Sequence, residues 1–444
     1  MSLSYEHPVR SRARSLSFVV VWLSVCHACL ASAASKPDEQ SPKEQSTVTG
    51  AHSKVGTRRT GGPTGKRGGA RAKQLRQIRA TRYTDHDKAW HEQPNLTGHW
   101  FGARPWVEER GLVLEPGYSV ELASVLSGSG AGKTSLGGLF DLVGALKGDP
   151  LGLGNSKLVL IGQVAHGDGV SEGGVEDLQI ISNIDCPDRH QFSELWLRQE
   201  LAGGRLWFKL GKMDANVDFA ALELAAELIH SSFGVPPNIP LPTFPDPGYG
   251  AAVAFEPSQV WRYELGFFEG APSGLRWLPG KETFANGFVA LAEATAHTAP
   301  LFGRGKGGSV HLGAWHRRPT GASAEASASG AWALFEEPFW SSGSRLAAVF
   351  GQLSWDFGAN AVVPLYVGGG LLTQGVFDAR DHDVISLAIA QARLTGGAET
   401  AVELQYKLPI IASVNLAIDL QYIDQPAGHA GSALAGLMRL TTLL

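Results

Sequence analysis

The sequence predicts an all-β fold: a single antiparallel transmembrane β-barrel of sixteen strands, preceded by a disordered basic N-terminal extension. Apolar and polar residues alternate in two successive runs, 401–408 and 414–422. Each run is close to the roughly 9 to 11 residues that a tilted strand needs to cross a bilayer. An export signal at the start of the chain agrees with such a fold. So does a charged content of only 18%, against about 25% in a typical soluble protein.

Residues 1–34 have the pattern of a secretory signal peptide. Arginines at positions 10, 12 and 14 precede an apolar run at 18–25, and small residues at 31–33 suit a cleavage site. An uncleaved anchor helix is the alternative, but the apolar run is shorter than the ~18 residues that such a helix needs. The mature protein is therefore expected to start near Ala34.

Cysteine usage limits the covalent chemistry of the mature chain. Cys26 and Cys29 lie inside the predicted signal peptide, so its removal leaves Cys186 alone. No intrachain disulfide or multi-cysteine metal site is then expected. Val25 before Cys26 disfavours a lipoprotein, which needs a small residue at that position.

Residues 35–94 are predicted to form a basic, low-complexity periplasmic extension. Arginine and lysine alternate there with glycine, serine and threonine, and apolar residues are too few for a folded core. A solvated tail is the favoured interpretation, and contact with anionic lipid or cell wall is the alternative. The formal net charge of -4 for the whole chain is too small to indicate a charged partner, and no nucleic acid is expected.

Residues 95–444 are predicted to form the barrel. The sixteen strand candidates are 117–127, 136–146, 156–166, 191–202, 205–214, 249–257, 260–269, 286–297, 308–318, 330–337, 345–356, 364–374, 383–394, 399–408, 414–424 and 431–444. Bacterial single-chain barrels have an even number of strands, which agrees with this assignment.

The lengths of the connections support the same topology, because such barrels have short periplasmic turns and longer outer loops. The connections at 203–204, 256–259 and 409–413 are short, whereas 215–248 is long and rich in proline. If the first strand runs outward, all three short turns fall on the periplasmic side.

The segment 194–211 allows a prediction of register, since glycines at 203 and 204 tolerate the positive φ angles of a tight hairpin turn. The predicted pairs on one face are Leu201 with Leu206 and Leu197 with Leu210. The predicted pairs on the other face are Glu200 with Trp207, Arg198 with Lys209, and Trp196 with Gly211. A soluble sandwich would bury the leucines equally well.

Charged residues on the second face favour a water-filled lumen, because Arg198 beside Lys209 would be destabilising in a dry interior. In the later hairpin, Glu403 is predicted to face Asp419 across the same lumen, while Leu404 and Ile418 contact lipid. A slip of one residue in the register would reverse these faces. The tryptophans at 196 and 207 either stack on sugar rings or simply fill lumen volume.

Several polar motifs are better explained as loops than as sites. Segment 127–134 resembles a phosphate-binding loop, but Ser127 replaces the first glycine and no helix signature follows. The histidine and aspartate groups at 166–168 and 381–383 lack the spacing of a zinc site. The histidine and serines at 230–232 lack a G-x-S-x-G elbow. No catalytic, cofactor or metal site is therefore predicted.

Four segments carry a family resemblance. They are Leu96-Thr-Gly-His-Trp-Phe-Gly-Ala-Arg104, followed by Glu109-Arg-Gly111; Leu210-Gly-Lys-Met-Asp-Ala-Asn216; Ser231-Ser-Phe-Gly-Val-Pro-Pro237; and Phe244-Pro-Asp-Pro-Gly-Tyr-Gly250. Together they resemble the carbohydrate-selective outer-membrane porins of the OprB family. The basic extension is not part of the family's core pattern, and Leu444 stands where such barrels commonly end in an aromatic residue.

The resemblance implies an outer-membrane barrel through which mono- or oligosaccharides diffuse passively, with selection at a constriction. The residues expected to line the lumen are Trp196, Arg198, Glu200, Trp207, Lys209, Glu403 and Asp419, and the loop 215–248 is expected to narrow it. Outer-membrane lipid and the barrel assembly machinery are the other expected partners, and a homotrimer is considered. The alternatives are a general or anion-selective porin and an exported β-rich binding protein without a pore. An enzyme is not expected.

Overall fold

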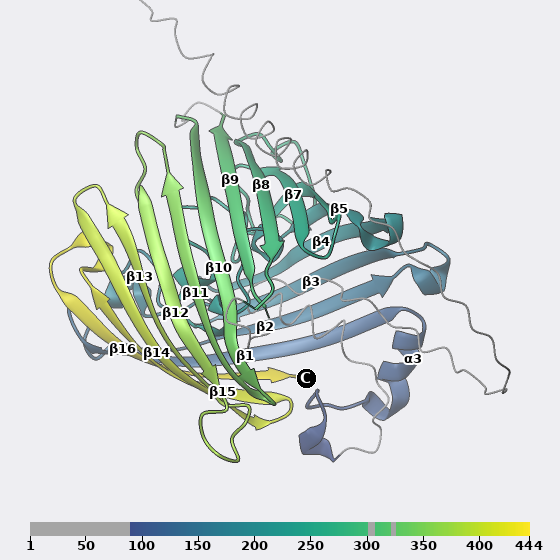
Figure 1. Cartoon of the computed structure of the whole chain (residues 1–444), viewed down its shortest axis with the longest axis horizontal. Helices are drawn as coiled ribbons and strands as arrows, with labels where there is room; N and C mark the ends of the chain where they lie inside the picture. Colours follow the sequence, from purple (N-terminus) through teal and green to yellow (C-terminus); the bar gives the residue numbers. More distant parts are fainter. Residues whose placement is uncertain (1–88, 301–306, 321–325) are drawn as a thin grey trace, which may run out of the picture. The chain divides into compact units, whose positions relative to one another are not determined.

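The computed structural model describes residues 89–300, 307–320 and 326–444, so the predicted signal peptide and nearly all of the basic extension lie outside the described residues. The described chain forms a closed barrel of sixteen antiparallel strands in which each strand pairs with its sequence neighbours and β1 pairs with β16 (Figure 1). The predicted number of strands and their antiparallel closure are confirmed. Within the described residues, no helix is long and apolar enough to cross a membrane.

The strands are β1 (Leu112–Ser127), β2 (Thr134–Lys147), β3 (Ser156–His166), β4 (Arg189–Leu201), β5 (Leu206–Met213), β6 (Gly248–Phe255), β7 (Trp261–Glu269), β8 (Gly287–His297), β9 (Ser309–Pro319), β10 (Ala328–Ser342), β11 (Arg345–Asp356), β12 (Leu365–Gln374), β13 (Val384–Leu394), β14 (Gly397–Ile411), β15 (Val414–Asp424) and β16 (Ser432–Leu443). The helices are α3 (Ala103–Glu109) and α4 (Ser231–Gly234). Short helical turns are η1 (Trp90–Glu92), η2 (Trp100–Gly102), η3 (Asp149–Leu151), η4 (Ser171–Val175), η5 (Ala202–Gly204), η6 (Ala215–Val217), η7 (Ala225–Glu227) and η8 (Pro426–Gly428).

Strand boundaries agree closely with the alternating pattern. β3, β11 and β15 begin and end at the predicted residues. The largest differences are extensions: β1 begins at Leu112, and β10 continues to Ser342. β14 also continues, to Ile411. β14 runs through Pro409, which lies opposite Asn415 next to a register shift. Proline is tolerated in a strand at such a bulge, so it did not end the strand as the pattern suggested.

The wall has two different faces because successive side chains on a strand point to opposite sides. On β13, Leu387 and Ile389 are exposed on the outside, whereas Ala388 and Ala390 are buried inside. Large apolar side chains are exposed in the same alternating way on most other strands. An apolar outer wall around a polar interior is the arrangement of a barrel that spans a bilayer.

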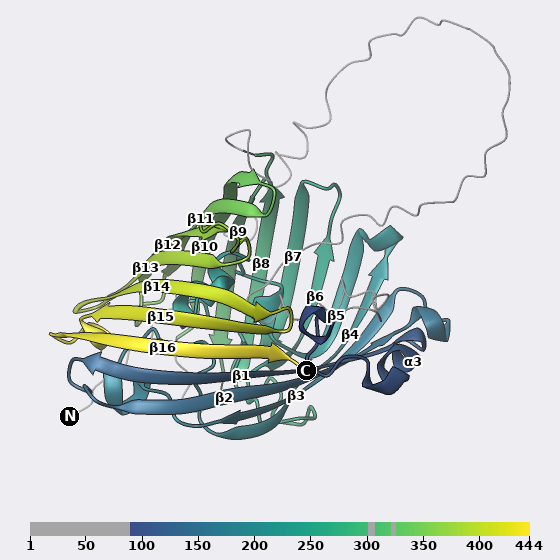
Figure 2. The ribbon, with the colours of Figure 1, turned by 90° about the horizontal axis from the view of Figure 1, so that it is seen from below.

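Figure 2 shows β16 beside β1, where the barrel closes. The loops are distributed unequally between the two ends of the barrel. The connections 167–188, 214–247 and 270–286 follow odd-numbered strands and therefore share one end. The short turns predicted after β4, β6 and β14 share the other end, as expected. The N-terminal segment binds at this second end, where Leu96 N–H donates to the Leu443 carbonyl and Arg104 Nη2 donates to the Leu444 carbonyl, both at 2.8 Å.

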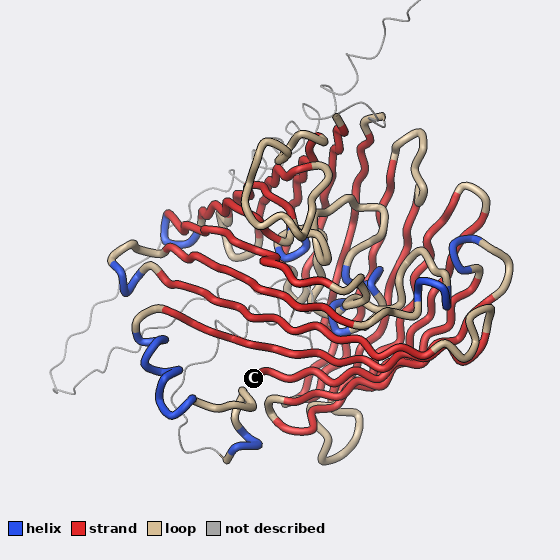
Figure 3. Tube along the Cα trace, turned by 180° about the vertical axis from the view of Figure 1, so that it is seen from behind, coloured by secondary structure: helices blue, strands red, loops and turns tan. Residues whose placement is uncertain are grey.

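The connection 214–247, hereafter the lumen loop, folds into the barrel. Its Phe219 and Phe233 are fully buried, and they pack edge-on against Phe268 of β7 and Phe350 of β11 with ring centroids 6.1 and 6.0 Å apart. Figure 3 shows short helical turns and loop segments among the strands of the barrel. The lumen loop thus forms an apolar core with one side of the wall and narrows the interior.

Candidate functional site: the barrel lumen

The hairpin of β4 and β5 has the predicted register. Leu201 pairs with Leu206, Leu197 with Leu210, Glu200 with Trp207, Arg198 with Lys209, and Trp196 with Gly211. The turn is longer than two residues because β4 ends at Leu201 and β5 starts at Leu206. Gly203 and Gly204 have the expected positive φ angles, 68° and 89°.

Each cation on the inner face of this hairpin has an acid of its own, which relieves the repulsion between Arg198 and Lys209. Arg198 Nη2 lies 2.9 Å from Glu200 Oε1. Lys209 Nζ lies 2.8 Å from Asp218 Oδ2 on the lumen loop. Burial opposes the ionisation of Asp218, but the ammonium of Lys209 holds the pKa of this carboxyl below its ordinary value. The Lys209–Asp218 pair therefore joins the wall to the lumen loop.

The two tryptophans lie beneath these cations. The Arg198 guanidinium is 4.3 Å from the Trp207 ring centroid, and Lys209 Nζ is 4.3 Å from that of Trp196. Both indoles are buried. Arg198 and Glu200 keep 17% and 29% of their side chains exposed, so they are the members of this group that face the open lumen.

The structure corrects the predicted pairing of Glu403 with Asp419. Glu403 lies opposite Gln421, and Asp419 lies opposite Gln405. The prediction that the two carboxylates directly face each other is wrong by two residues, because the strands continue past Pro409 and shift at the bulge. A register shift of two residues leaves each side chain on its predicted face, because side chains alternate with a period of two. Both acids are buried inside, and Leu404 and Ile418 are 49% and 51% exposed outside.

Glu403 has a role that the sequence did not indicate. Its carboxylate accepts hydrogen bonds from the backbone N–H groups of Ile229 and His230, at 2.7 and 3.1 Å. Both donors belong to the lumen loop. The alternating pattern shows that Glu403 points inward. It does not show which backbone N–H groups bind the Glu403 carboxylate.

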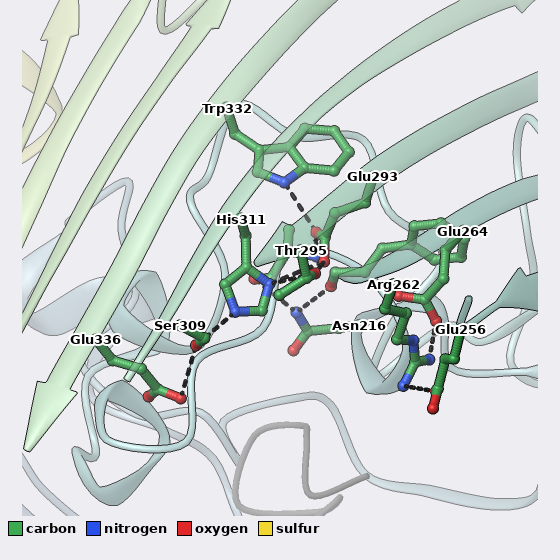
Figure 4. A network of polar contacts seen from close by, with 12 residues as sticks. Asn216, Glu256, Arg262, Glu264, Glu293, Thr295, Ser309, His311, Trp332 and Glu336 are labelled. Atoms are coloured by element: carbon green, nitrogen blue, oxygen red, sulfur yellow. Dashed lines mark hydrogen bonds and ion pairs between the residues drawn. The ribbon is translucent and has the colours of Figure 1, made fainter. Parts of the chain in front are cut away.

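A second anchoring network, centred on Glu293 of β8, was also missed. Its carboxylate accepts from Ala220 N–H of the lumen loop at 2.8 Å and from Trp332 Nε1 at 3.0 Å, and it lies 2.9 Å from His311 Nδ1. Figure 4 shows these side chains converging from different strands, with Ser309 between His311 and Glu336. The network fixes the start of the lumen loop to β8, β9 and β10.

The connection 167–188, hereafter the second loop, also enters the lumen. Asn183 N–H donates to the Ile229 carbonyl at 2.9 Å, so the second loop pairs with the lumen loop. Glu399 of β14 accepts from the N–H groups of Leu178 and Gln179 at 2.7 and 2.8 Å. Arg439 of β16 holds the same loop through Asn183 Oδ1 at 2.7 Å.

Opposite charges are paired elsewhere in the interior as well. Arg439 Nη2 lies 2.6 Å from Glu121 Oε2. Lys407 Nζ lies 2.8 Å from Glu227 Oε2 on the lumen loop. With the two pairs of the β4–β5 hairpin, the interior presents paired charges beside hydrogen-bonding groups. Such a surface suits a neutral, hydroxyl-rich solute.

The polar motifs of the sequence lie in connections between strands or at strand ends. Ser232 Oγ lies 2.9 Å from His230 Nδ1, but both side chains are buried, and burial lowers the pKa of His230 to about 3. Segment 127–134 spans the connection between β1 and β2. Across the described ranges, no group of three or more histidine, cysteine, aspartate or glutamate residues is arranged to hold a metal ion.

Comparisons with known proteins agree with this geometry. The high-pH structure of Pseudomonas putida OprB is 19% identical, has a TM-score of 0.73, and covers 80% of this chain and 100% of its own. The low-pH structure of the same protein is 18% identical with a TM-score of 0.56, over 80% of this chain and 99% of its own. A search of curated proteins finds no match. The structural likeness supports a shared fold.

The sequence model of carbohydrate-selective porins of the OprB family matches residues 163–443, more than half of the chain. This match includes the end of β3, the thirteen complete strands from β4 to β16, and both inserted loops. The chain therefore belongs to the OprB family of carbohydrate-selective porins, β-barrels of the outer membrane.

Proposed function

We propose that small carbohydrates cross the outer membrane through this lumen by passive diffusion and bind weakly at the region narrowed by the two inserted loops. The observation that carries the proposal is the pairing of charges there. Arg198, Lys209 and Arg439 each have a carboxylate within 3 Å. Each of these pairs weakens the local field of its charges but leaves donors and acceptors for hydroxyl groups. A diffusion channel needs such weak binding, because the solute must also leave.

The seven predicted lining residues divide into two groups by exposure. Arg198 and Glu200 are proposed to contact the sugar, since their side chains remain partly exposed. The other five shape the wall behind them: Trp196, Trp207, Lys209, Glu403 and Asp419. In this arrangement the tryptophans support the overlying cations, and they do not serve as open stacking platforms.

Sugar titration of single-channel current tests this proposal. A monosaccharide should reduce the current in a saturable way, and Arg198→Gln and Glu200→Gln should each weaken the block. Leu197→Val, on the outer face of the same strand, is the matched control and should leave the block unchanged. A channel that sugars do not block, and that strongly prefers anions, would instead support a general or anion-selective porin.

We propose a homotrimer as the assembly, with β8–β10 in contact. Ala292 lies opposite Ala314, and Ala314 opposite Ala331, so small outward residues form a row across three neighbouring strands. Small residues permit close approach of two walls in a membrane. Ala314→Trp should shift cross-linked trimers to monomers while the barrel stays folded. Trimers that persist unchanged would exclude this face as the contact.

Export is proposed to follow the ordinary outer-membrane route. Residues 1–34 would direct secretion and be removed, 35–94 would remain as a basic periplasmic extension, and the assembly machinery would insert the barrel. N-terminal sequencing of the mature protein tests the first step, with a start near Ala34 expected. A mature chain that retains residues 1–34 would contradict it.

A further inference from the structure

Carboxylates of the wall hold the backbone of the lumen loop at successive points. Glu293 of β8 accepts from Ala220 N–H at 2.8 Å, and Glu336 of β10 accepts from Leu224 N–H at 2.9 Å. Glu403 of β14 accepts from the N–H groups of Ile229 and His230. These three strands are spread around the barrel, so the loop is fixed along its length and across the lumen.

The chemistry of these contacts makes them strong constraints. A buried backbone N–H that loses its acceptor is costly, so each of these contacts resists displacement of the loop. Glu403 is fully buried and uses one carboxylate oxygen for each of two adjacent N–H groups. This forked arrangement fixes the orientation of the loop as well as its distance from β14.

Neutral side chains fix the remaining part of the loop. Tyr366 Oη donates to the Ser232 carbonyl at 2.8 Å, and Gln352 Nε2 donates to the Phe233 carbonyl at 2.9 Å. The bonded groups on the loop are again backbone atoms. The wall therefore determines the path of the loop, while loop side chains such as Phe219 remain free to pack in the apolar core.

We propose that Glu403, Glu293 and Glu336 are positioning residues that set the width of the channel by holding the lumen loop. This inference rests on the lumen being the path of the sugar, although the carboxylates act on the loop and do not touch the solute. Loss of one contact lets the loop move away from its wall strand, so the aperture fluctuates and admits larger solutes.

Glu403→Gln is the sharpest test, because glutamine has nearly the same shape but presents an amide NH₂ to one of the two loop N–H groups. In about 1 M KCl, where surface charge effects are strongly screened, we expect a raised mean conductance, greater current noise and a larger sugar size cut-off. Glu336→Gln should act in the same direction. Heat-modifiable migration verifies that each variant is a folded barrel.

Glu264→Gln is the matched control. Glu264 is a buried inward glutamate of β7 whose carboxylate pairs with Arg262 of the same strand. Its substitution removes a buried carboxylate without removing a hydrogen bond to the loop backbone, so conductance and cut-off should stay near the native values. Folded Glu403→Gln and Glu336→Gln channels with native conductance, noise and cut-off would overturn the proposal.

Tyr366→Phe keeps the inference testable if Glu403→Gln does not assemble. It removes one hydroxyl, and with it the bond to the Ser232 carbonyl, while the ring stays in place. A smaller change in noise in the same direction is expected, and native behaviour would count against the proposal. KCl conductance is measured without sugar, so the two proposals can fail separately. If these variants alter the conductance but sugars do not block the channel, the proposed sugar contacts are rejected and the positioning role is retained.

Discussion

Lys209 of β5 and Asp218 of the lumen loop form an ion pair of 2.8 Å between two buried side chains. Removing one member of a buried pair leaves the other charge uncompensated, at a typical cost of about 3–5 kcal/mol. Lys209→Met should therefore lower the thermal stability of the folded barrel and increase channel noise. Lys209→Met/Asp218→Asn should recover most of both losses. A double variant as impaired as the single one would show that the pair is not the cause.

The face assignment of β4 predicts opposite labelling of neighbouring residues. With Cys186 replaced by serine, Arg198→Cys should react in intact membranes with a small water-soluble thiol reagent, because Arg198 is partly exposed inside the lumen. Leu197→Cys should be protected, because its side chain faces lipid. The measurement is the labelled fraction after a short exposure. Labelling at 197 with protection at 198 would reverse the two faces.

Phe233 should be a main packing anchor of the lumen loop. It is fully buried against Phe350 and His230. Phenylalanine-to-alanine changes in cores cost about 3–5 kcal/mol, so Phe233→Ala should release this part of the loop. We expect faster proteolysis within the loop and higher conductance in bilayers, with the barrel itself retained. Native proteolysis and conductance in the variant would exclude Phe233 as an anchor.

Closure of the second loop should depend on pH through Asp177. Burial, reinforced by nearby Glu399, raises the pKa of Asp177 from an ordinary 3.8 to about 7. Asp177 therefore binds its proton more tightly when the second loop is closed than when this loop is open. Closure is favoured fully below the ordinary pKa and weakens as the pH rises through the raised value.

Amide hydrogen exchange at Leu178 and Gln179 measures this effect. After correction for intrinsic rates, exchange should be faster at about pH 8 than at about pH 5, in line with that linkage. Asp177→Asn should abolish the difference, while Asp168→Asn, at an exposed position of the same loop, should retain it. Corrected exchange that slows as the pH rises would contradict the assigned sign.

The sequence predicted the barrel well because period-two alternation is a local property. It placed both ends of β3, β11 and β15 correctly, and it gave the register of β4 with β5 because a short connection fixes that register. The register of β14 with β15 was missed by two residues. Proline is disfavoured inside a strand, which predicts that the strand ends before Pro409. β14 instead accommodates Pro409 beside a bulge.

The interior was less predictable because its partners are distant in sequence. Nothing local in the sequence joins Glu403 to the backbone of Ile229, or Glu293 to that of Ala220. Trp207 is buried beneath Arg198, and the alternating pattern does not show that this cation covers the indole. Inward polar residues were visible in the pattern, but their contacts with the inserted loops were not.

Swelling of proteoliposomes in iso-osmotic sugar tests the central claim most directly. Liposomes that contain the purified barrel should swell rapidly in a monosaccharide and more slowly in a disaccharide, because neutral sugars diffuse through the narrowed lumen. Protein-free liposomes provide the baseline. Proteoliposomes that conduct KCl but swell in monosaccharide no faster than this baseline would contradict passive carbohydrate diffusion through the channel.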